Sequence, residues 1–236
     1  MRLTLSSGEE AAAAASARGD VIVLIDALRA TTTIITALAE GVREVMPVAT
    51  VEECTGELTA GERKGAKLPG MDLDNSPRSF LNRAHAEKRL TLTTTNGTRC
   101  LKAAAANPDA VVLIAAMVNL NAVTSAAAHI TEYYGKDLSI IPSGRLHEEA
   151  VEDNLTAELI KKAIESGRPV PKTPESEAAH LRIFMEGSSG LNLISLGLKY
   201  DIPFCAQQDL YETVPVFQNG VCRPLCNDEP PLRWLK

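Results

Sequence analysis

Four segments of the chain repeat one pattern: a short run typical of a strand, a polar loop, and then apolar residues at helical spacing. In the first, the run VIVLI at 21–25 precedes DALRATTT and a helical segment that ends at Gly41. The pattern returns after strands predicted at 90–94, 110–115 and 138–141. Runs that are apolar throughout indicate strands buried on both faces, and repeated strand, loop and helix units predict a mostly parallel sheet. We therefore expect a three-layer α/β fold with helices on both faces.

The rest of the chain adds to this core. VMPVATV at 45–51 predicts another strand, followed by a short helix and a long loop at 61–80. The alanine run near the N-terminus predicts a surface helix. Residues 1–236 are expected to form one domain, in which the proline-rich segment at 167–175 is a candidate boundary between two lobes. Two helices and a C-terminal β-hairpin on an Asn219–Gly220 turn should follow.

Composition and charge exclude several function classes. The formal net charge of −6 provides no global positive field, so neither nucleic acid nor an anionic membrane is an expected partner. The sequence has no run of 18 apolar residues, and its five cysteines form no C-x-x-C pair. Glu9 and Glu10 precede the alanine run, so we do not expect this segment to be a secretory leader. We expect a cytoplasmic protein with reduced thiols. A homodimer is compatible with the low charge and the apolar hairpin.

Polar side chains follow the ends of several predicted strands. Because ligands of open parallel sheets bind beyond the carboxyl ends of the strands, these side chains should converge on one rim. The candidates are Asp26, Arg29, Thr31, Thr32, Thr94, Thr95, Asn96, Gly97, Arg99, Arg145, Glu152 and Asp153.

Two threonine clusters, 31–33 and 94–98, lie at predicted helix starts. Helix capping is the simpler explanation for each, but unpaired backbone N–H groups at a helix start also attract anions. The arginines near these loops carry a planar guanidinium suited to phosphate, sulfonate or carboxylate, although a surface salt bridge is the usual role of an arginine. Together the two features favour recognition of a small anion.

Asp26 is the best placed carboxylate for a hard cation, since Mg²⁺ binds through one or two carboxylates plus water and phosphate oxygens. Capping of the next helix is an equally good explanation for Asp26. Glu152 and Asp153 are adjacent, so their side chains diverge by ~100° on a helix. We expect one of the two, rather than both, to point into the site.

Several common phosphate and hydrolase motifs are absent. A phosphatase of the haloacid-dehalogenase type needs Asp-x-Asp after its first strand, but the chain has Leu28 in place of the second aspartate. Neither a P-loop, nor a G-x-G-x-x-G fingerprint, nor a G-x-S-x-G elbow occurs.

Five segments, in order, resemble the 2-phosphosulfolactate phosphatase family of coenzyme M biosynthesis: IDALRATTTIITAL, AGERKGAKLPGMDLDNSP, TLTTTNGTR, VEDNLTAELI and FCAQQDLYETVPVF. The resemblance extends from Val21 to Phe217. It implies an α/β fold unrelated to haloacid dehalogenases. It also implies a Mg²⁺-dependent phosphatase that converts 2-phosphosulfolactate, a small phosphorylated anion, to sulfolactate and phosphate.

On this hypothesis Mg²⁺ is held by Asp26 and by Glu152 or Asp153, with Asp26, Arg29, Glu62 and Asp153 as the catalytic residues. Arg63 on the long loop and the threonine and arginine residues named above would bind the substrate. Asn96 and Gly97, in the turn that follows Thr95, would help to cradle the anion. Two alternatives stay open: a phosphatase or lyase that acts on another small phosphorylated carboxylate, and a homologue that binds anions without catalysis.

Overall fold

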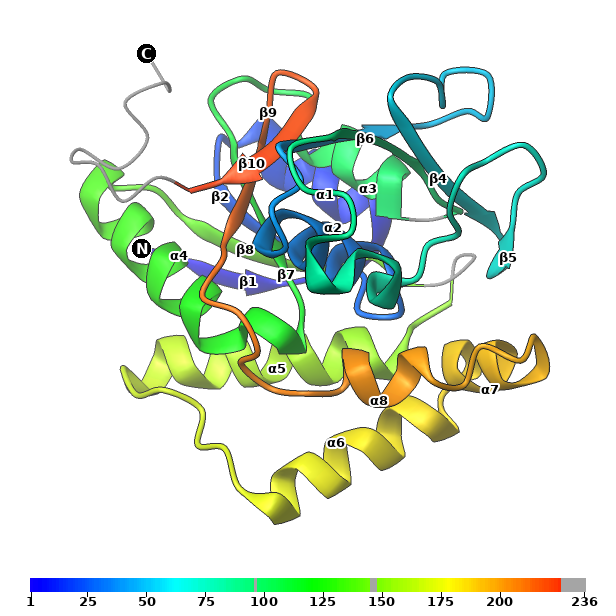
Figure 1. Cartoon of the computed structure of the whole chain (residues 1–236). Helices are drawn as coiled ribbons and strands as arrows, with labels where there is room; N and C mark the ends of the chain where they lie inside the picture. Colours follow the sequence, from blue (N-terminus) through cyan, green and yellow to red (C-terminus); the bar gives the residue numbers. More distant parts are fainter. Residues whose placement is uncertain (96, 145–147, 226–236) are drawn as a thin grey trace.

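The computed structural model describes residues 1–95, 97–144 and 148–225. Its strands form one sheet in the order β1-β8-β2-β7-β9-β10-β3-β6-β4-β5 (Figure 1). The strands are β1 (Leu3–Leu5), β2 (Val21–Ile25), β3 (Glu44–Val48), β4 (Leu58–Arg63), β5 (Ala66–Lys67), β6 (Arg89–Thr93), β7 (Val111–Ala115), β8 (Leu138–Pro142), β9 (Pro215–Gln218) and β10 (Val221–Pro224).

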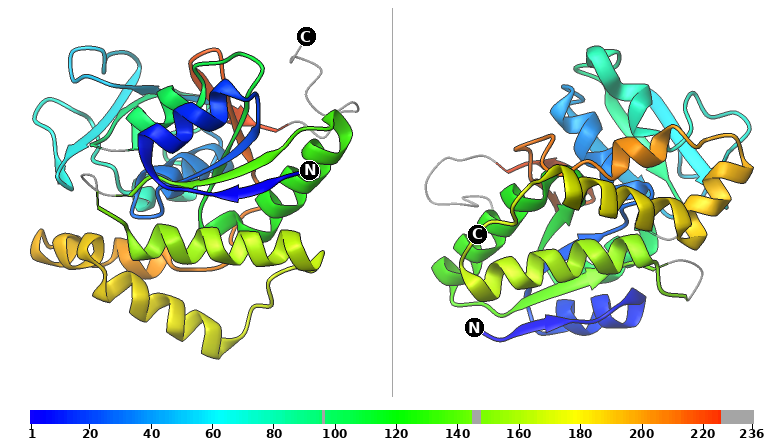
Figure 2. Two further views of the ribbon diagram at one scale, coloured as in Figure 1. Left: turned by 180° about the vertical axis from the view of Figure 1, so that it is seen from behind. Right: turned by 90° about the horizontal axis from the view of Figure 1, so that it is seen from below.

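Helices cover both faces of the sheet, as predicted, and Figure 2 shows α1 on the face opposite α5 and α6. They are α1 (Gly8–Ala17), α2 (Ala30–Ala39), α3 (Gly97–Ala104), α4 (Leu120–Tyr134), α5 (Val151–Ser166), α6 (Pro174–Glu186), α7 (Ser188–Ser195) and α8 (Asp201–Cys205), with 3-10 turns η1 (Pro77–Arg83) and η2 (Met117–Asn119). No helix in the described ranges is long and apolar enough to span a membrane.

The predicted strand at 21–25 is β2, and all five of its residues are buried. Ile22 and Leu24 pack with α1, α2 and α3 in one hydrophobic core. Val21, Val23 and Ile25 pack with α4 to α8 in a second core on the other face. Alternate residues of a strand point to opposite faces, so a run that is apolar throughout serves both cores.

Three predictions about secondary structure are wrong. The segment at 61–80, expected to be one long loop, contains the end of β4, all of β5 and the start of η1, because β4 turns back at residues 64–65 to pair with β5. The short helix expected after 45–51 does not form: residues 49–57 are turns and bends, and β4 follows directly, paired in parallel with β6. Gly56, with φ of +131°, gives this connection a backbone conformation that no helix uses. The C-terminal third has three described helices, α6, α7 and α8, rather than two. A kink at Gly187, which has extended backbone, divides α6 from α7.

The predicted C-terminal hairpin forms, but in the middle of the sheet. β9 pairs antiparallel with β7, and β10 pairs antiparallel with β3. The hairpin thereby joins two parallel groups of strands, β1-β8-β2-β7 and β3-β6-β4.

The sheet is curved around α2 and α3. In the sheet order, β7, β9, β10 and β3 separate β2 from β6, yet α3, which directly follows β6, packs against β2. One hydrophobic core contains side chains of β2 and β7 together with side chains of β3, β4 and β6. The curvature brings the carboxyl ends of β2 and β6 together, although the two strands are not neighbours.

The central hairpin leads to a test of stability. Phe217 of β9 is 8% exposed and lies in register with Val112 and Cys222 of the two neighbouring strands. Phe217→Ala should lower the free energy of unfolding in urea by about 3–5 kcal/mol, because it leaves a cavity in the core. The control is Tyr200→Ala, whose ring is 62% exposed, with an expected loss below about 1 kcal/mol. Similar losses in the two variants would mean that the hairpin is not part of the core.

Candidate functional site

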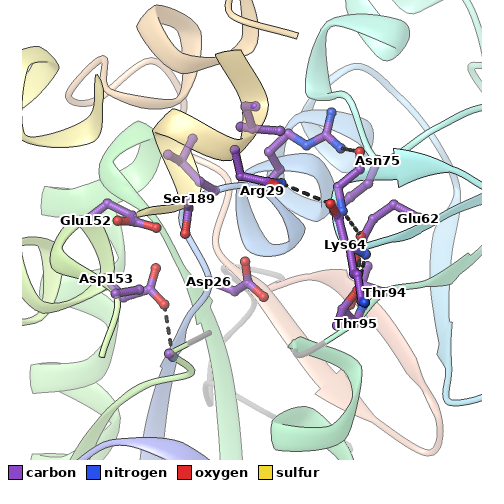
Figure 3. A pocket seen from close by; sticks show the side chains of 16 residues that line it. Asp26, Arg29, Glu62, Lys64, Asn75, Thr94, Thr95, Glu152, Asp153 and Ser189 are labelled. Carbon is purple, nitrogen blue, oxygen red and sulfur yellow. Dashed lines mark hydrogen bonds between the residues drawn. The ribbon is translucent and has the colours of Figure 1, made fainter. Parts of the chain in front are cut away.

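A pocket lies at the carboxyl ends of β2, β4, β6 and β8 and is completed by the start of α5 and by α7 (Figure 3). It is therefore on the rim where the sequence places the polar loops. The predicted residues that line it are Asp26, Arg29, Glu62, Thr94, Thr95, Glu152 and Asp153.

Asp26 follows β2 directly and is 9% exposed. Its backbone N–H donates to Thr31 Oγ1 at 3.0 Å, and its Oδ1 accepts from the backbone N–H of Ala30 at 3.2 Å. Both contacts fix Asp26 at the start of α2, so part of its role is the capping that the sequence allowed.

The start of α3 comes very close to the Asp26 carboxylate. A Cβ added at Gly97 would lie 2.8 Å from Asp26 Oδ2 and 2.9 Å from the Cβ of Ala30. Only glycine therefore fits at this position. Gly97 was predicted to cradle an anion, and in the structure it lies against an anionic group of the protein itself.

Burial, together with the negative charges of Glu62 and Glu152, raises the pKa of Asp26 from its ordinary value of 3.8 to about 7, although hydrogen bonds from the backbone N–H groups of Ala30 and Gly97 act in the opposite direction. Burial, together with the charges of Asp26 and Glu152, also raises the pKa of Asp153 well above its usual range. The pocket thus concentrates negative charge that the protein only partly compensates.

Glu152 and Asp153 both line the pocket, so the expectation that only one of them would enter is wrong. Both lie in the first turn of α5, and they are 1% and 2% exposed. The pocket covers the end of the helix and not its side, so two side chains that diverge around the axis can both reach it. Asp153 also accepts hydrogen bonds from the backbone N–H groups of Ala27, at 2.8 Å, and Gly144, at 3.2 Å.

Arg29 is buried, at 3% exposed, and is joined to Leu28 by a cis peptide bond. Its guanidinium lies 2.7 Å from a carboxylate oxygen of Asp201 and 3.3 Å from one of Asp74. Its other terminal nitrogen donates to the carbonyl of Gly65 at 2.9 Å. Arg29 lines the pocket as predicted, but its two terminal nitrogens already bind groups of the protein.

Glu62 ties the end of β4 to the loop before α3. Its carboxylate accepts from the backbone N–H of Thr95 at 2.6 Å and from that of Gly65, also at 2.6 Å. The neighbouring Thr94 caps α3, because its hydroxyl accepts from the N–H of Thr98 at 3.3 Å. These contacts order one wall of the pocket.

Five of the predicted binding residues do not line the pocket: Gly97, described above, and Thr31, Thr32, Arg63 and Arg99. Thr31 and Thr32 are buried, and their hydroxyls bond to the backbone of Asp26 and Ala27. Arg63 is next to Glu62 on β4, so its side chain points to the opposite face of the sheet, where it donates a hydrogen bond to the hydroxyl of Thr93. Arg99 lies on the exposed side of α3. Their predicted part in binding stays a prediction. The predictions for Asn96 and Arg145 fall outside the described residues.

Other lining residues were not predicted, among them Lys64, Asn75, Ser189 and Asn192. Lys64 and Asn75 lie within AGERKGAKLPGMDLDNSP, one of the five segments that resemble the family, so the resemblance could have identified them as candidates. Ser189 and Asn192 belong to α7, which follows no strand, so the rule about strand ends could not identify them. Asn75 is 3% exposed, and its buried Oδ1 accepts no hydrogen bond from any residue that the structure describes.

The chain is similar to known proteins of one family. The sequence profile of the 2-phosphosulpholactate phosphatase family matches residues 8–220. A "Probable 2-phosphosulfolactate phosphatase" of Thermotoga petrophila is 35% identical over 213 residues, covering 84% of this chain and 89% of the relative. A protein with the same name from Pseudothermotoga lettingae is 37% identical over 210 residues, with coverage of 84% and 89%.

A third protein of that name, from Clostridium tetani, is 32% identical over 218 residues and covers 86% of this chain and 91% of its own length. The matched region contains every strand from β2 to β9 and every pocket residue described above. The chain therefore belongs to the 2-phosphosulpholactate phosphatase family.

Proposed function

We propose that the protein is a Mg²⁺-dependent phosphatase that hydrolyses 2-phosphosulfolactate to 3-sulfolactate and phosphate, as a step in coenzyme M biosynthesis. The observation that carries the proposal is the convergence of three buried carboxylates, Asp26, Glu152 and Asp153, in one pocket at the strand ends of a chain of this family. Buried free cysteines at positions 54, 100, 205 and 222 are in keeping with a cytoplasmic location.

The pocket residues fit a hard cation in their chemistry. Asp26, Glu152 and Asp153 offer oxygen donors, and a bound cation would offset the burial and the repulsion from Asp26 and Glu152 that raise the pKa of Asp153. The buried Oδ1 of Asn75 also lacks a described partner, at a typical cost of about 1–3 kcal/mol for such a group. Within residues 1–95, 97–144 and 148–225, no three His, Cys, Asp or Glu side chains are already arranged to share one ion. When bound, Mg²⁺ would neutralise the charge of the transferred phosphoryl group.

The chain itself provides the remaining elements of an anion site. α2, α3 and α5 all begin at the pocket, and their first N–H groups favour negative charge. Arg29, held by Asp201, adds fixed positive charge to the wall. These groups would position the phosphate ester beside Asp26.

Two roles for Asp26 are compatible with its place: ligand of the cation, and nucleophile that forms an aspartyl phosphate. Acid quenching of a single turnover with substrate labelled in the phosphate separates them. Label that stays on the wild-type protein and is released by hydroxylamine supports the nucleophile, whereas its absence at every time supports direct attack by water.

Removing the Asp26 carboxylate should abolish turnover in either role. Asp26→Asn should lower kcat by roughly 10³-fold or more, measured as phosphate release with saturating Mg²⁺. Asp109→Asn is the control, because Asp109 is an exposed aspartate outside the pocket, and it should keep wild-type kcat. An Asp26→Asn variant with near wild-type turnover would refute the proposed site.

The pH dependence of stability tests the buried charge of Asp26 without any measurement of activity. The pKa of Asp26 is about 7 in the folded protein against an ordinary 3.8, so its protonation stabilises the fold at low pH and this gain is lost as pH rises through 7. With a chelator at about pH 8, Asp26→Asn should raise the melting temperature by about 2–10 °C, and at about pH 4, close to the ordinary pKa of an aspartate, it should change little. Mg²⁺ at about pH 8 should raise the melting temperature of the wild type more than that of the variant. A variant that is less stable at both pH values would contradict the charge argument.

The substrate is tested by comparing phosphate release from 2-phosphosulfolactate, 2-phospholactate and phosphoglycolate. A higher kcat/KM for 2-phosphosulfolactate is expected, because the pocket should recognise all three anionic groups of this substrate. Preference for a substrate without a sulfonate would favour the alternative phosphatase. Thermal stabilisation by these compounds without any phosphate release would indicate a homologue that binds anions without catalysis.

A further inference from the structure

The turn between β4 and β5 holds a lysine in an unusual backbone conformation at the pocket. Lys64 has φ of +54° and Gly65 has φ of +89°, both in the left-handed region. Residues other than glycine seldom adopt this conformation, and where it persists the surrounding contacts must impose it. Lys64 lines the pocket opposite Glu152 and Asp153 (Figure 3).

Side chains from two distant elements hold the backbone of Lys64. Its N–H donates to Thr95 Oγ1 at 3.0 Å, in the loop before α3. Its carbonyl accepts from Asn192 Nδ2 at 2.9 Å, on α7. The two partners lie far from Lys64 in sequence, so these bonds fix the turn to the walls of the pocket.

The backbone of Gly65 is held in the same way. Its N–H donates to Glu62 Oε2 at 2.6 Å, and its carbonyl accepts from Arg29 at 2.9 Å. A Cβ at this position would lie 2.8 Å from Asn192 Nδ2 and 2.9 Å from Leu196 Cδ1. All four polar backbone groups of the turn are therefore bonded to side chains, and α7 packs directly against it.

The side chain of Lys64 contrasts with this fixed backbone. It is exposed, and its ammonium makes no hydrogen bond or ion pair with any residue that the structure describes. Other cations of this region already bind protein groups: Arg29 binds Asp201, Arg63 binds Thr93, and Lys67 donates to the carbonyl of Asp72. Among the described lining residues, Lys64 carries the positive charge that is left for a ligand.

We propose that Lys64 binds the sulfonate of the substrate and so determines specificity. This inference rests on the proposed function, which places the phosphate beside Asp26 and the carboxylates of α5, across the pocket from Lys64 (Figure 3). A planar carboxylate suits paired donors such as a guanidinium, whereas an ammonium is a point charge with three rotatable donors. The three-oxygen sulfonate matches that kind of donor.

The experiment compares Lys64→Met with two substrates that differ only in the sulfonate, 2-phosphosulfolactate and 2-phospholactate. KM for 2-phosphosulfolactate should rise roughly 10-fold or more with kcat changed less than about threefold, as expected for the loss of a charged hydrogen bond in binding. KM for 2-phospholactate should change less than about threefold. Lys64→Arg should recover part of the loss, because it keeps the charge.

The matched control is Lys67→Met, which removes a neighbouring exposed lysine outside the pocket and should leave both KM values unchanged. Equal melting temperatures of wild type and Lys64→Met would establish that the variant is folded. An equal rise in KM for both substrates would overturn the assignment to the sulfonate, and no rise for either would overturn any role in binding.

Binding of the product 3-sulfolactate, measured by calorimetry against lactate, separates this inference from the proposed function. If the wild type releases no phosphate, the proposed function fails. The inference then stands only if wild type binds 3-sulfolactate and Lys64→Met binds it roughly 10-fold more weakly. Equal binding by the two proteins, or none by either, would overturn it.

Discussion

Mutual repulsion among buried carboxylates is the constraint on which this site depends. Asp26, Glu152 and Asp153 come from two different elements and are almost excluded from water, so the protein must supply groups that hold them. For Asp26 and Asp153 it does so with backbone N–H groups of Ala30, Ala27 and Gly144, which are fixed in position by the fold. The glycine at the start of α3 lets this helix come within contact of the Asp26 carboxylate. The remaining negative charge makes the pocket suitable for a cation.

The opposite wall of the pocket is built around the turn formed by Lys64 and Gly65. There the side chains of Glu62, Thr95, Asn192 and Arg29 are all used to hold one two-residue turn in place. Arg29 is itself held by Asp201, which also accepts a hydrogen bond from Ser76 at 2.7 Å. Polar side chains that the sequence suggests as ligand-binding groups are thus bonded within the wall itself. The side chain of Lys64 stays exposed.

The local parts of this arrangement could be predicted from the sequence. Strands such as β2 are continuous apolar runs, and the residues just beyond them, Asp26, Thr94 and Thr95, do meet in one pocket. Contacts that depend on the curvature of the sheet could not be predicted, since no local pattern shows that Arg29 pairs with Asp201 or that α7 completes the site. Asp153 was found because it follows a strand and a loop, whereas Ser189 has no such signal. The central position of the hairpin could not be predicted for the same reason, because the sequence pattern of an antiparallel hairpin is the same at the edge of a sheet and in its middle.

The position of that hairpin has a consequence for how the chain acquires its structure. β9 and β10 are the last described strands in the chain, yet they lie between β7 and β3 and are the link between the two parallel groups. During synthesis, both β7 and β3 present an unpaired strand edge until residues 215–224 have left the ribosome. The long separation in sequence between these partners gives the fold a high contact order and should make closure of the sheet slow. The two walls of the pocket are therefore assembled late, after most of the chain has been made.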